Sequence, residues 1–450
     1  MNDKYDPVKG DVVPVFFHYT IPSVIAMLAM SSAFMIDGIF VGNYVGASAL
    51  AAVNLSLPVW SALFAVISML AIGGSVMAGS YLGENNLAAA SNIFAKAMAT
   101  SLLFALVISI SGLLLIDQLV LALGANESLV GLVSAYLKII LIFSPGFLMG
   151  AALFYFVKVD GNPLLASGAL IITALLNIAL NWLFIVNMGM GIEGAAYATG
   201  IAESTTLLIL LCHFFTSRAT LKFTSLTGSW RKVFTAMING FSEFANEISI
   251  GLTALLFNWV MISKAGVEGV AALTIVNYLF FIGVIIFYGI GESLQPLVSK
   301  NLGARQSQKI AGYVTAALIS TMLTALALCT ILIVLPEFLI GLFLKPEETA
   351  TLEIAKEFIT YFWPAFLFSG FNITLTEYFT ACQKPAYSAA IAVSRSLVLP
   401  CILLLTLPLW LGDIGIYIAI PVAEFLTCLM AVLFAVKNLP EQMVTNHQSR

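Results

Sequence analysis

Asp37 is the only residue with a full charge between Asp11 and Glu84. A carboxylate within hydrophobic sequence long enough to span a membrane is costly, and such groups mark ion or substrate pathways. The position of Asp37 therefore predicts a functional carboxylate.

Two asparagines provide partners for this carboxylate. Asn177 and Asn181 are one helical turn apart, so they share a helix face. Their expected depth in the outer half of their helix matches that of Asp37, about five residues before the end of its own helix. A carboxylate between carboxamides has partners whether protonated or ionised, which suits a proton switch. Alternatively, Asp37 caps the helix end or bonds the backbone locally.

Further acids lie in hydrophobic sequence of the second half, namely Glu243, Glu247, Glu292 and Glu377. Glu243 is expected near the middle of the membrane, and either Glu243 or Glu292 could serve a second proton path or attract a cationic substrate. For Glu377 we favour a structural ion pair with Arg395, because buried opposite charges usually neutralise one another.

Acids outnumber bases in these segments, where only Lys138 and Arg395 are basic, so an interior cavity should prefer cations. Aromatic residues and methionines suit lipophilic cations, although most of them face lipid or pack helices. Weak candidates for substrate contact are Tyr136, Phe154, Asn258 and Tyr278. The cysteine and histidine spacings indicate no metal site.

The composition predicts an all-α membrane protein, with 60% hydrophobic and 9% charged residues over 450 positions. Uncharged runs reach the roughly 20 residues that a spanning helix needs. The expected transmembrane helices cover 14–41, 49–80, 92–117, 129–157, 163–187, 192–216, 233–262, 269–299, 310–343, 353–381, 387–409 and 412–436. The first of these lacks the features of a cleavable signal peptide and should be retained.

An even number of spans places both termini on one side, and basic residues identify it by the positive-inside rule. Only Lys264, Lys345 and Lys356 fall on the opposite side. The residues on the side of the termini are Lys4, Lys9, Lys96, Lys158, Arg218, Lys222, Arg231, Lys232, Lys300, Arg305, Lys309, Lys384, Lys437 and Arg450. Both termini are therefore expected to be cytoplasmic.

An internal repeat appears when the two halves of the sequence are aligned at a nearly constant offset. The matched pairs are Gly46 and Gly266, 51–52 and 271–272, Gly83 and Gly303, Pro145 and Pro364, Gly191 and Gly412, Gly194 and Gly415, and Glu203 and Glu424. Six helices per half predict two parallel, pseudo-symmetric lobes. We expect a first lobe over 1–216, a cytoplasmic linker over 217–232 and a second lobe over 233–450. Glu203 and Glu424, at matching positions, are expected to serve the symmetric scaffold.

Several motifs together resemble the multidrug and toxin extrusion (MATE) transporters over essentially the whole chain. They are Pro22 followed by 37–42 (DGIFVG), 79–84 (GSYLGE), 160–163 (DGNP), 177–181 (NIALN), 191–196 (GIEGAA), 295–296 (QP) and 301–304 (NLGA). The resemblance implies a multi-pass efflux pump in a bacterial inner membrane that exports cationic drugs. It further implies a proton or sodium gradient as the energy source, no nucleotide or other cofactor, no nucleic-acid partner and a monomer.

Asn181 departs from the family pattern, in which an aspartate is common at this position. Because a sodium site favours several hard oxygens with negative charge among them, losing a carboxylate favours proton coupling. We therefore favour the proton-coupled, bacterial DinF-like branch. Sodium-coupled efflux by the same fold remains an alternative, since amide oxygens also bind sodium.

Helix 14–41 also contains Pro22 and Gly38, which predict a hinge. Protonation of Asp37 could bias this helix between a straight and a bent form.

Two rival classes of protein fit the sequence less well. A flippase for lipid-linked anionic sugars needs a basic cavity, and the sequence has no paired aspartates, serine elbow or His–Glu spacing typical of an enzyme.

Overall fold

The protein is described by a computed structural model that places residues 3–343 and 349–448, and every regular element within these ranges is helical. The predictions for Lys345 and Arg450 lie outside the described residues. The first half contains η1 (Asp3–Tyr5), α1 (Val12–Phe40), η2 (Val41–Val45), α2 (Ala47–Gly83), α3 (Leu87–Leu114), α4 (Ile116–Ala122), α5 (Val130–Val159), α6 (Pro163–Asn181), η3 (Trp182–Asn187), α7 (Gly191–Leu211) and η4 (Cys212–Phe215).

The second half repeats this order with a few additional breaks. It contains α8 (Arg231–Asn239), α9 (Phe241–Gly303), α10 (Ser307–Val334), α11 (Pro336–Gly341), α12 (Thr349–Phe362), α13 (Ala365–Ala381), α14 (Pro385–Val393), η5 (Ser394–Val398), α15 (Leu399–Leu411), α16 (Asp413–Tyr417), α17 (Ala419–Lys437) and α18 (Pro440–Gln448). The elements η2, η3 and η5 are π-helical, whereas η1 and η4 are 3₁₀ turns.

The prediction of an all-α protein with twelve transmembrane helices is confirmed. The described residues contain 11 helices able to span a membrane, plus a twelfth span made of α12 and α13, which meet at a 55° bend. The helix α9 contains two of the spans, Phe241–Met261 and Glu268–Gly303.

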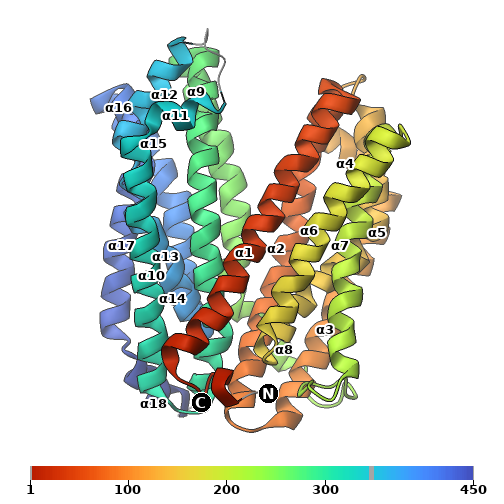
Figure 1. Ribbon diagram of the computed structural model, residues 1–450, viewed down its shortest axis with the longest axis vertical. Coiled ribbons are helices and arrows are strands. Elements are labelled where there is room, and N and C mark those ends of the chain that lie inside the picture. Colours follow the sequence, from red (N-terminus) through yellow and green to blue (C-terminus); the bar gives the residue numbers. More distant parts are fainter. Residues whose placement is uncertain (1–2, 344–348, 449–450) are drawn as a thin grey trace.

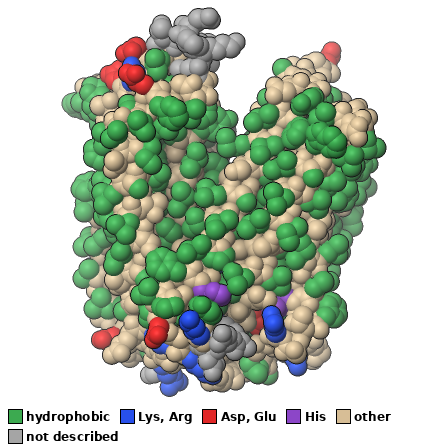
Figure 2. All heavy atoms as spheres, in the orientation of Figure 1, with side chains coloured by type: hydrophobic (Ala, Val, Ile, Leu, Met, Phe, Trp, Pro, Cys, Tyr) green, Lys and Arg blue, Asp and Glu red, His purple; other side chains and the backbone are tan. Residues whose placement is uncertain are grey.

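The helices form two lobes that diverge toward the end away from the termini (Figure 1). Both chain ends lie at the opposite end, called here the terminal end. In the space-filling view the outer surface is largely hydrophobic, and basic side chains gather at the terminal end (Figure 2). A notch separates the lobes at the far end of the same view.

At the terminal end the lobes are held together by close backbone packing between α2 and α9. A Cβ atom added at Gly83 would lie 2.0 Å from the Lys300 carbonyl oxygen, and one added at Gly303 would lie 1.9 Å from that of Ser80. These two glycines are a matched pair of the repeat, so each lobe contributes the same close contact. Only glycine fits such an approach of two backbones.

Helix α1 connects the two lobes. Its first turns, with Val15, Phe16 and Tyr19, belong to a hydrophobic cluster formed mainly by the second half, whereas Val41 beyond its end belongs to the cluster of the first lobe. Just before α1, the Pro7 carbonyl oxygen accepts hydrogen bonds from Asn301 and Tyr313. A change in the shape of α1 would therefore act on both lobes.

The connection between the halves is attached to the first lobe. The Asp160 carboxylate, in the DGNP loop before α6, accepts hydrogen bonds from the backbone amides of Thr220 and Leu221 at 3.0 to 3.2 Å. The same carboxylate lies 2.7 Å from His213 Nε2. The short helix α8 then packs on α2.

We expect Gly83→Ala to destabilise the protein by about 1–3 kcal/mol, because the added methyl group overpacks the contact with the Lys300 carbonyl. Thermal unfolding of the purified protein in detergent measures this effect. Gly168→Ala is the matched control, since nothing lies within 4 Å of the Cβ added there. Equal unfolding temperatures for the two variants would contradict the close packing.

Candidate binding cavity

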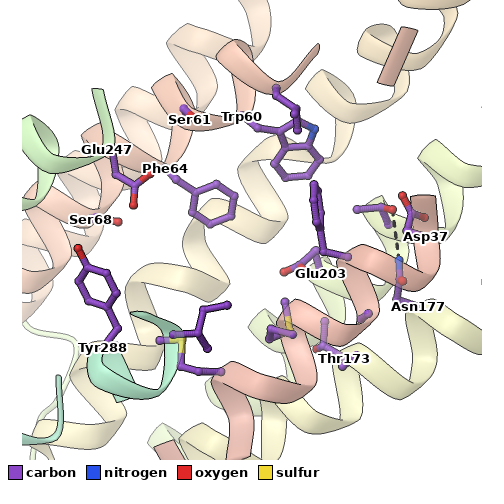
Figure 3. A pocket seen from close by; sticks show the side chains of 18 of the residues that line it. Asp37, Trp60, Ser61, Phe64, Ser68, Thr173, Asn177, Glu203, Glu247 and Tyr288 are labelled. Atoms are coloured by element: carbon purple, nitrogen blue, oxygen red, sulfur yellow. Dashed lines mark hydrogen bonds between the residues drawn. The ribbon is translucent and has the colours of Figure 1, made fainter. Parts of the chain in front are cut away.

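A cavity of about 480 Å³ lies between the lobes (Figure 3). Its acidic lining consists of Asp37, Glu203, Glu243, Glu247 and Glu292. Its aromatic lining consists of Phe34, Trp60, Phe64, Tyr136, Tyr155 and Tyr288. Among the described residues no lysine or arginine contributes to this lining, so the cavity wall combines negative charge with aromatic faces.

The structure brings the three predicted residues Asp37, Asn177 and Asn181 together on the first-lobe wall. Asn181 Nδ2 donates to Asp37 Oδ1 at 2.8 Å and to Asn177 Oδ1 at 3.1 Å. Asn177 Nδ2 in turn donates to Thr199 Oγ1 at 3.2 Å. Asp37 is buried yet lines the cavity, so its carboxylate is both hydrogen-bonded by the Asn181 carboxamide and reachable from the space between the lobes.

Two π-helical segments begin next to this cluster. Segment η2 starts shortly after Asp37, and η3 starts directly after Asn181, the last residue of α6. The two segments also contact each other. Single π turns inside long helices occur frequently at functional sites, because they change the direction in which side chains point.

On the second-lobe wall, Glu292 is engaged by residues of the first lobe. Lys158 Nζ lies 3.5 Å from its carboxylate, and the Tyr155 hydroxyl donates to it at 3.3 Å. Lys158, expected on the side of the termini just after the helix over 129–157, is buried at the end of α5. Glu292 therefore forms a link between the lobes and is already neutralised, whereas Glu247 points toward the cavity across from the first-lobe wall (Figure 3).

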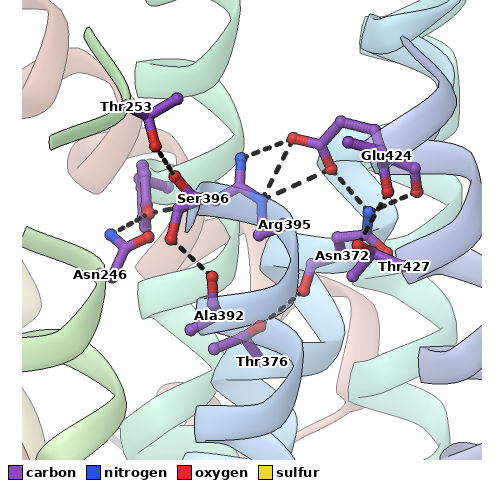
Figure 4. Close-up of polar contacts among 11 residues, drawn as sticks. Asn246, Thr253, Asn372, Thr376, Ala392, Arg395, Ser396, Glu424 and Thr427 are labelled. Carbon is purple, nitrogen blue, oxygen red and sulfur yellow. Dashed lines mark hydrogen bonds and ion pairs between the residues drawn. The ribbon is translucent and has the colours of Figure 1, made fainter. Parts of the chain in front are cut away.

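The predicted ion pair between Glu377 and Arg395 is wrong. Arg395 lies in η5 and directs its guanidinium to Glu424, with Nη2 at 3.0 Å and Nε at 3.2 Å from Oε1 (Figure 4). Asn372 Nδ2 donates to the other oxygen of Glu424 at 2.6 Å. Glu377 instead accepts a hydrogen bond from Gln295 Nε2 at 2.7 Å.

The remaining candidates divide between the cavity and other surroundings. Tyr136 and Glu243 line the cavity, and Glu243 Oε1 has no hydrogen-bond partner among the described residues. Phe154 lies under Lys158 Nζ, 4.7 Å from its ring centre, outside the cavity. Asn258 and Tyr278 are exposed and do not line it.

Of the aromatic side chains that line the cavity, the sequence singled out Tyr136 and missed the others, because nothing separates them in the sequence from rings facing lipid. Trp60, Phe64 and Phe147 form a stack, with ring centres 4.9 to 5.9 Å apart. Among the described residues no group of histidine, cysteine or acidic side chains could hold a metal ion by itself.

Comparison with known proteins places this architecture in a family. The MatE family model matches residues 22–183 and 247–405, so the chain belongs to the MATE family of multidrug efflux transporters. One curated relative is the multidrug export protein MepA of Staphylococcus saprophyticus, 21% identical over 94% of each chain. Family membership makes the protein a multi-pass membrane transporter rather than an enzyme.

Solved structures show the same fold. A MATE protein in complex with MaL6 has a TM-score of 0.92 at 20% identity and covers 100% of both chains. A MATE family transporter of the MOP superfamily in an outward-facing conformation has a TM-score of 0.89 at 22% identity and covers 96% of both chains.

We expect Glu424→Gln to destabilise the protein by about 3–5 kcal/mol, because it leaves the buried Arg395 guanidinium without a countercharge. Glu377→Gln should cost about 1 kcal/mol, since the new amide can still bond Gln295. Thermal unfolding in detergent compares the two variants. A larger loss of stability for Glu377→Gln than for Glu424→Gln would contradict the pairing of Arg395 with Glu424 and favour its pairing with Glu377.

Proposed function

We propose that the protein exports lipophilic organic cations in exchange for protons, by alternating access of a cavity between two lobes. The observation that carries the proposal is the position of Asp37, which lines an acidic and aromatic cavity and accepts a hydrogen bond from Asn181, itself bonded to Asn177. Carboxylates attract cations and aromatic faces bind them by cation–π contact. The transporter is proposed to act as a monomer in the bacterial inner membrane.

The distribution of charge supports an orientation with both termini in the cytoplasm. Basic side chains gather at the terminal end (Figure 2), as the positive-inside rule requires of a cytoplasmic face. The glycine contacts between α2 and α9 close the protein at this end. The cavity would then face the outside, ready to release substrate and take up a proton. In this scheme the lobes 1–216 and 233–450 rock about the linker 217–232.

Asp37 can exchange a proton without losing its hydrogen bonds. As an ionised carboxylate it accepts from Asn181 Nδ2. Asn181 Oδ1 has no hydrogen-bond partner among the described residues. Rotating this carboxamide by half a turn would present Oδ1 to the hydroxyl of a protonated Asp37, so each charge state has a partner. A protonated Asp37 also attracts a cation less strongly, which couples proton uptake to substrate release.

Sodium-coupled efflux by the same fold has a specific observation of its own. A second, small cavity lies next to the main one and is lined by Glu243, Glu377 and Asn246 together with Arg395. Carboxylate and amide oxygens suit sodium, but the guanidinium of Arg395 opposes a bound cation there. A flippase for lipid-linked anionic saccharides fits less well, because no base lines the main cavity among the described residues.

We expect Asp37→Asn to lower proton-driven export of a cationic dye at least about tenfold, since the amide cannot release a proton. Dye efflux from proteoliposomes under an imposed pH gradient, without sodium, measures the effect. Asp117→Asn, which removes an exposed carboxylate of α4 away from the cavity, should transport as the wild type does.

Wild-type rates for Asp37→Asn would make Asp37 structural and move the coupling site to Glu243 or Glu292. Export that follows a sodium gradient and ignores the pH gradient would instead establish sodium coupling.

The hinge hypothesis for α1 makes a separate prediction. Pro22 removes a backbone hydrogen bond within α1, and Gly38 has no atom closer than 4.0 Å to an added Cβ, so both ends of the helix can adjust. We expect distances between spin labels on α1 and α5 to change between acid and neutral pH in the wild type. They should not change in Asp37→Asn, and an unchanged α1 in transporting protein would exclude bending.

A further inference from the structure

The repeat allows the surroundings of a cavity carboxylate to be compared with those of its counterpart. Pro163 and Pro385 hold corresponding places, as the first residues of α6 and α14. The loops before them are also alike, since Gly161 and Gln383 both have positive φ angles, +99° and +55°. In this register the position that matches Arg395 is Thr173.

The next helix in each lobe carries the second pair of matched residues, Glu203 and Glu424. Gly194 of α7 and Gly415 of α16 are separated along the chain by the same interval as Glu203 and Glu424. The second lobe thus contains an arginine and a glutamate at positions where the first lobe contains Thr173 and Glu203.

In the second lobe, Arg395 and Glu424 form an ion pair with each other and take no part in the main cavity. The Arg395 guanidinium donates two hydrogen bonds to one oxygen of Glu424, and both side chains are buried outside the main cavity. A planar group with several N–H donors fits a carboxylate in this way, as arginine does at many recognition sites.

In the first lobe, Glu203, the counterpart of Glu424, has no arginine beside it at the matching position. Glu203 forms no hydrogen bond or ion pair within the described residues, and it lines the main cavity. Thr173 also lines the cavity and bonds Thr206 at 2.5 Å. Figure 3 shows Glu203 between Thr173 and Trp60, so the space next to it opens into the cavity between the lobes.

We propose that Glu203 binds a planar N–H cation of the substrate, a guanidinium or amidinium, in the place that Arg395 fills in the second lobe. The proposal rests on the proposed export of cations and names a substrate class for it. Trp60 offers an aromatic face on which such a planar cation stacks. A quaternary ammonium has no N–H donors and gains only the charge attraction at this carboxylate.

Binding to the purified protein without any gradient tests the proposal. The probes are an aryl guanidinium and the corresponding aryl trimethylammonium, with affinities measured by calorimetry. The wild type should prefer the guanidinium, and Glu203→Gln should weaken its binding roughly 10- to 100-fold, the usual range for a charge-assisted hydrogen-bond pair. The ammonium should lose less, so the preference should disappear.

Two further variants distinguish the site from general negative charge. Thr173→Arg should rebuild the ion pair of the second lobe and abolish guanidinium binding, whereas Thr173→Ser, which leaves the space beside Glu203 open, should retain it. Glu247→Gln removes the same charge from the other wall and should keep the preference for guanidinium.

Unchanged binding in Glu203→Gln would overturn the proposal, as would loss of the preference in Glu247→Gln alone. Glu203→Gln keeps the shape of the side chain and should fold. It therefore tests the proposal even if Thr173→Arg does not fold. Proton-driven export of the ammonium by the wild type tests the proposed function separately. If the wild type exports the ammonium and Glu203→Gln binds the guanidinium as the wild type does, the proposed export stands and the role of Glu203 is rejected.

Discussion

The cost of placing a carboxylate in an apolar interior is the constraint on which the rest of this structure depends. Several intramembrane acids meet this cost with a protein partner: Asp37 with Asn181, Glu292 with Lys158, Glu377 with Gln295, and Glu424 with Arg395. Glu203 and Glu247 line the cavity, as Asp37 and Glu292 do, but have no such partner among the described residues. The acids are thereby divided into those with a hydrogen-bonding partner inside the protein and those that have only the cavity beside them.

Close packing at one end of the molecule provides the mechanical counterpart to this division. The backbone contacts at Gly83 and Gly303 fix the lobes at the terminal end, whereas the cavity separates them farther along. Lys158 and Glu292 join the lobes beside the cavity, so an opening at the terminal end would have to break this pair. Breaking it exposes two charges at once, which helps to keep the lobes in one arrangement until a bound ion or substrate compensates the cost.

Hydropathy predicted the twelve spans, because each helix has to cover the hydrocarbon by itself. The cluster of Asp37, Asn177 and Asn181 was also predictable, since spacing by one turn and matching depth are properties of single helices. The partner of Arg395 was not predictable in this way. It depends on the rotation of neighbouring helices and on the π turn η5, and neither leaves a pattern in the sequence. The same reason separates Tyr136 in the cavity from Tyr278 on the surface.

Internal symmetry supplies the information that single-helix patterns lack. A repeat places equivalent backbone around two carboxylates, so a difference in one neighbouring side chain changes the role of one of them and leaves the other as a reference. Arg395 completes the pair in the second lobe, and Thr173 leaves Glu203 facing the cavity in the first. The ion pair of Arg395 and Glu424 is structural in the second lobe. Its geometry thus indicates the kind of cation that Glu203, at the matching position of the first lobe, is suited to bind.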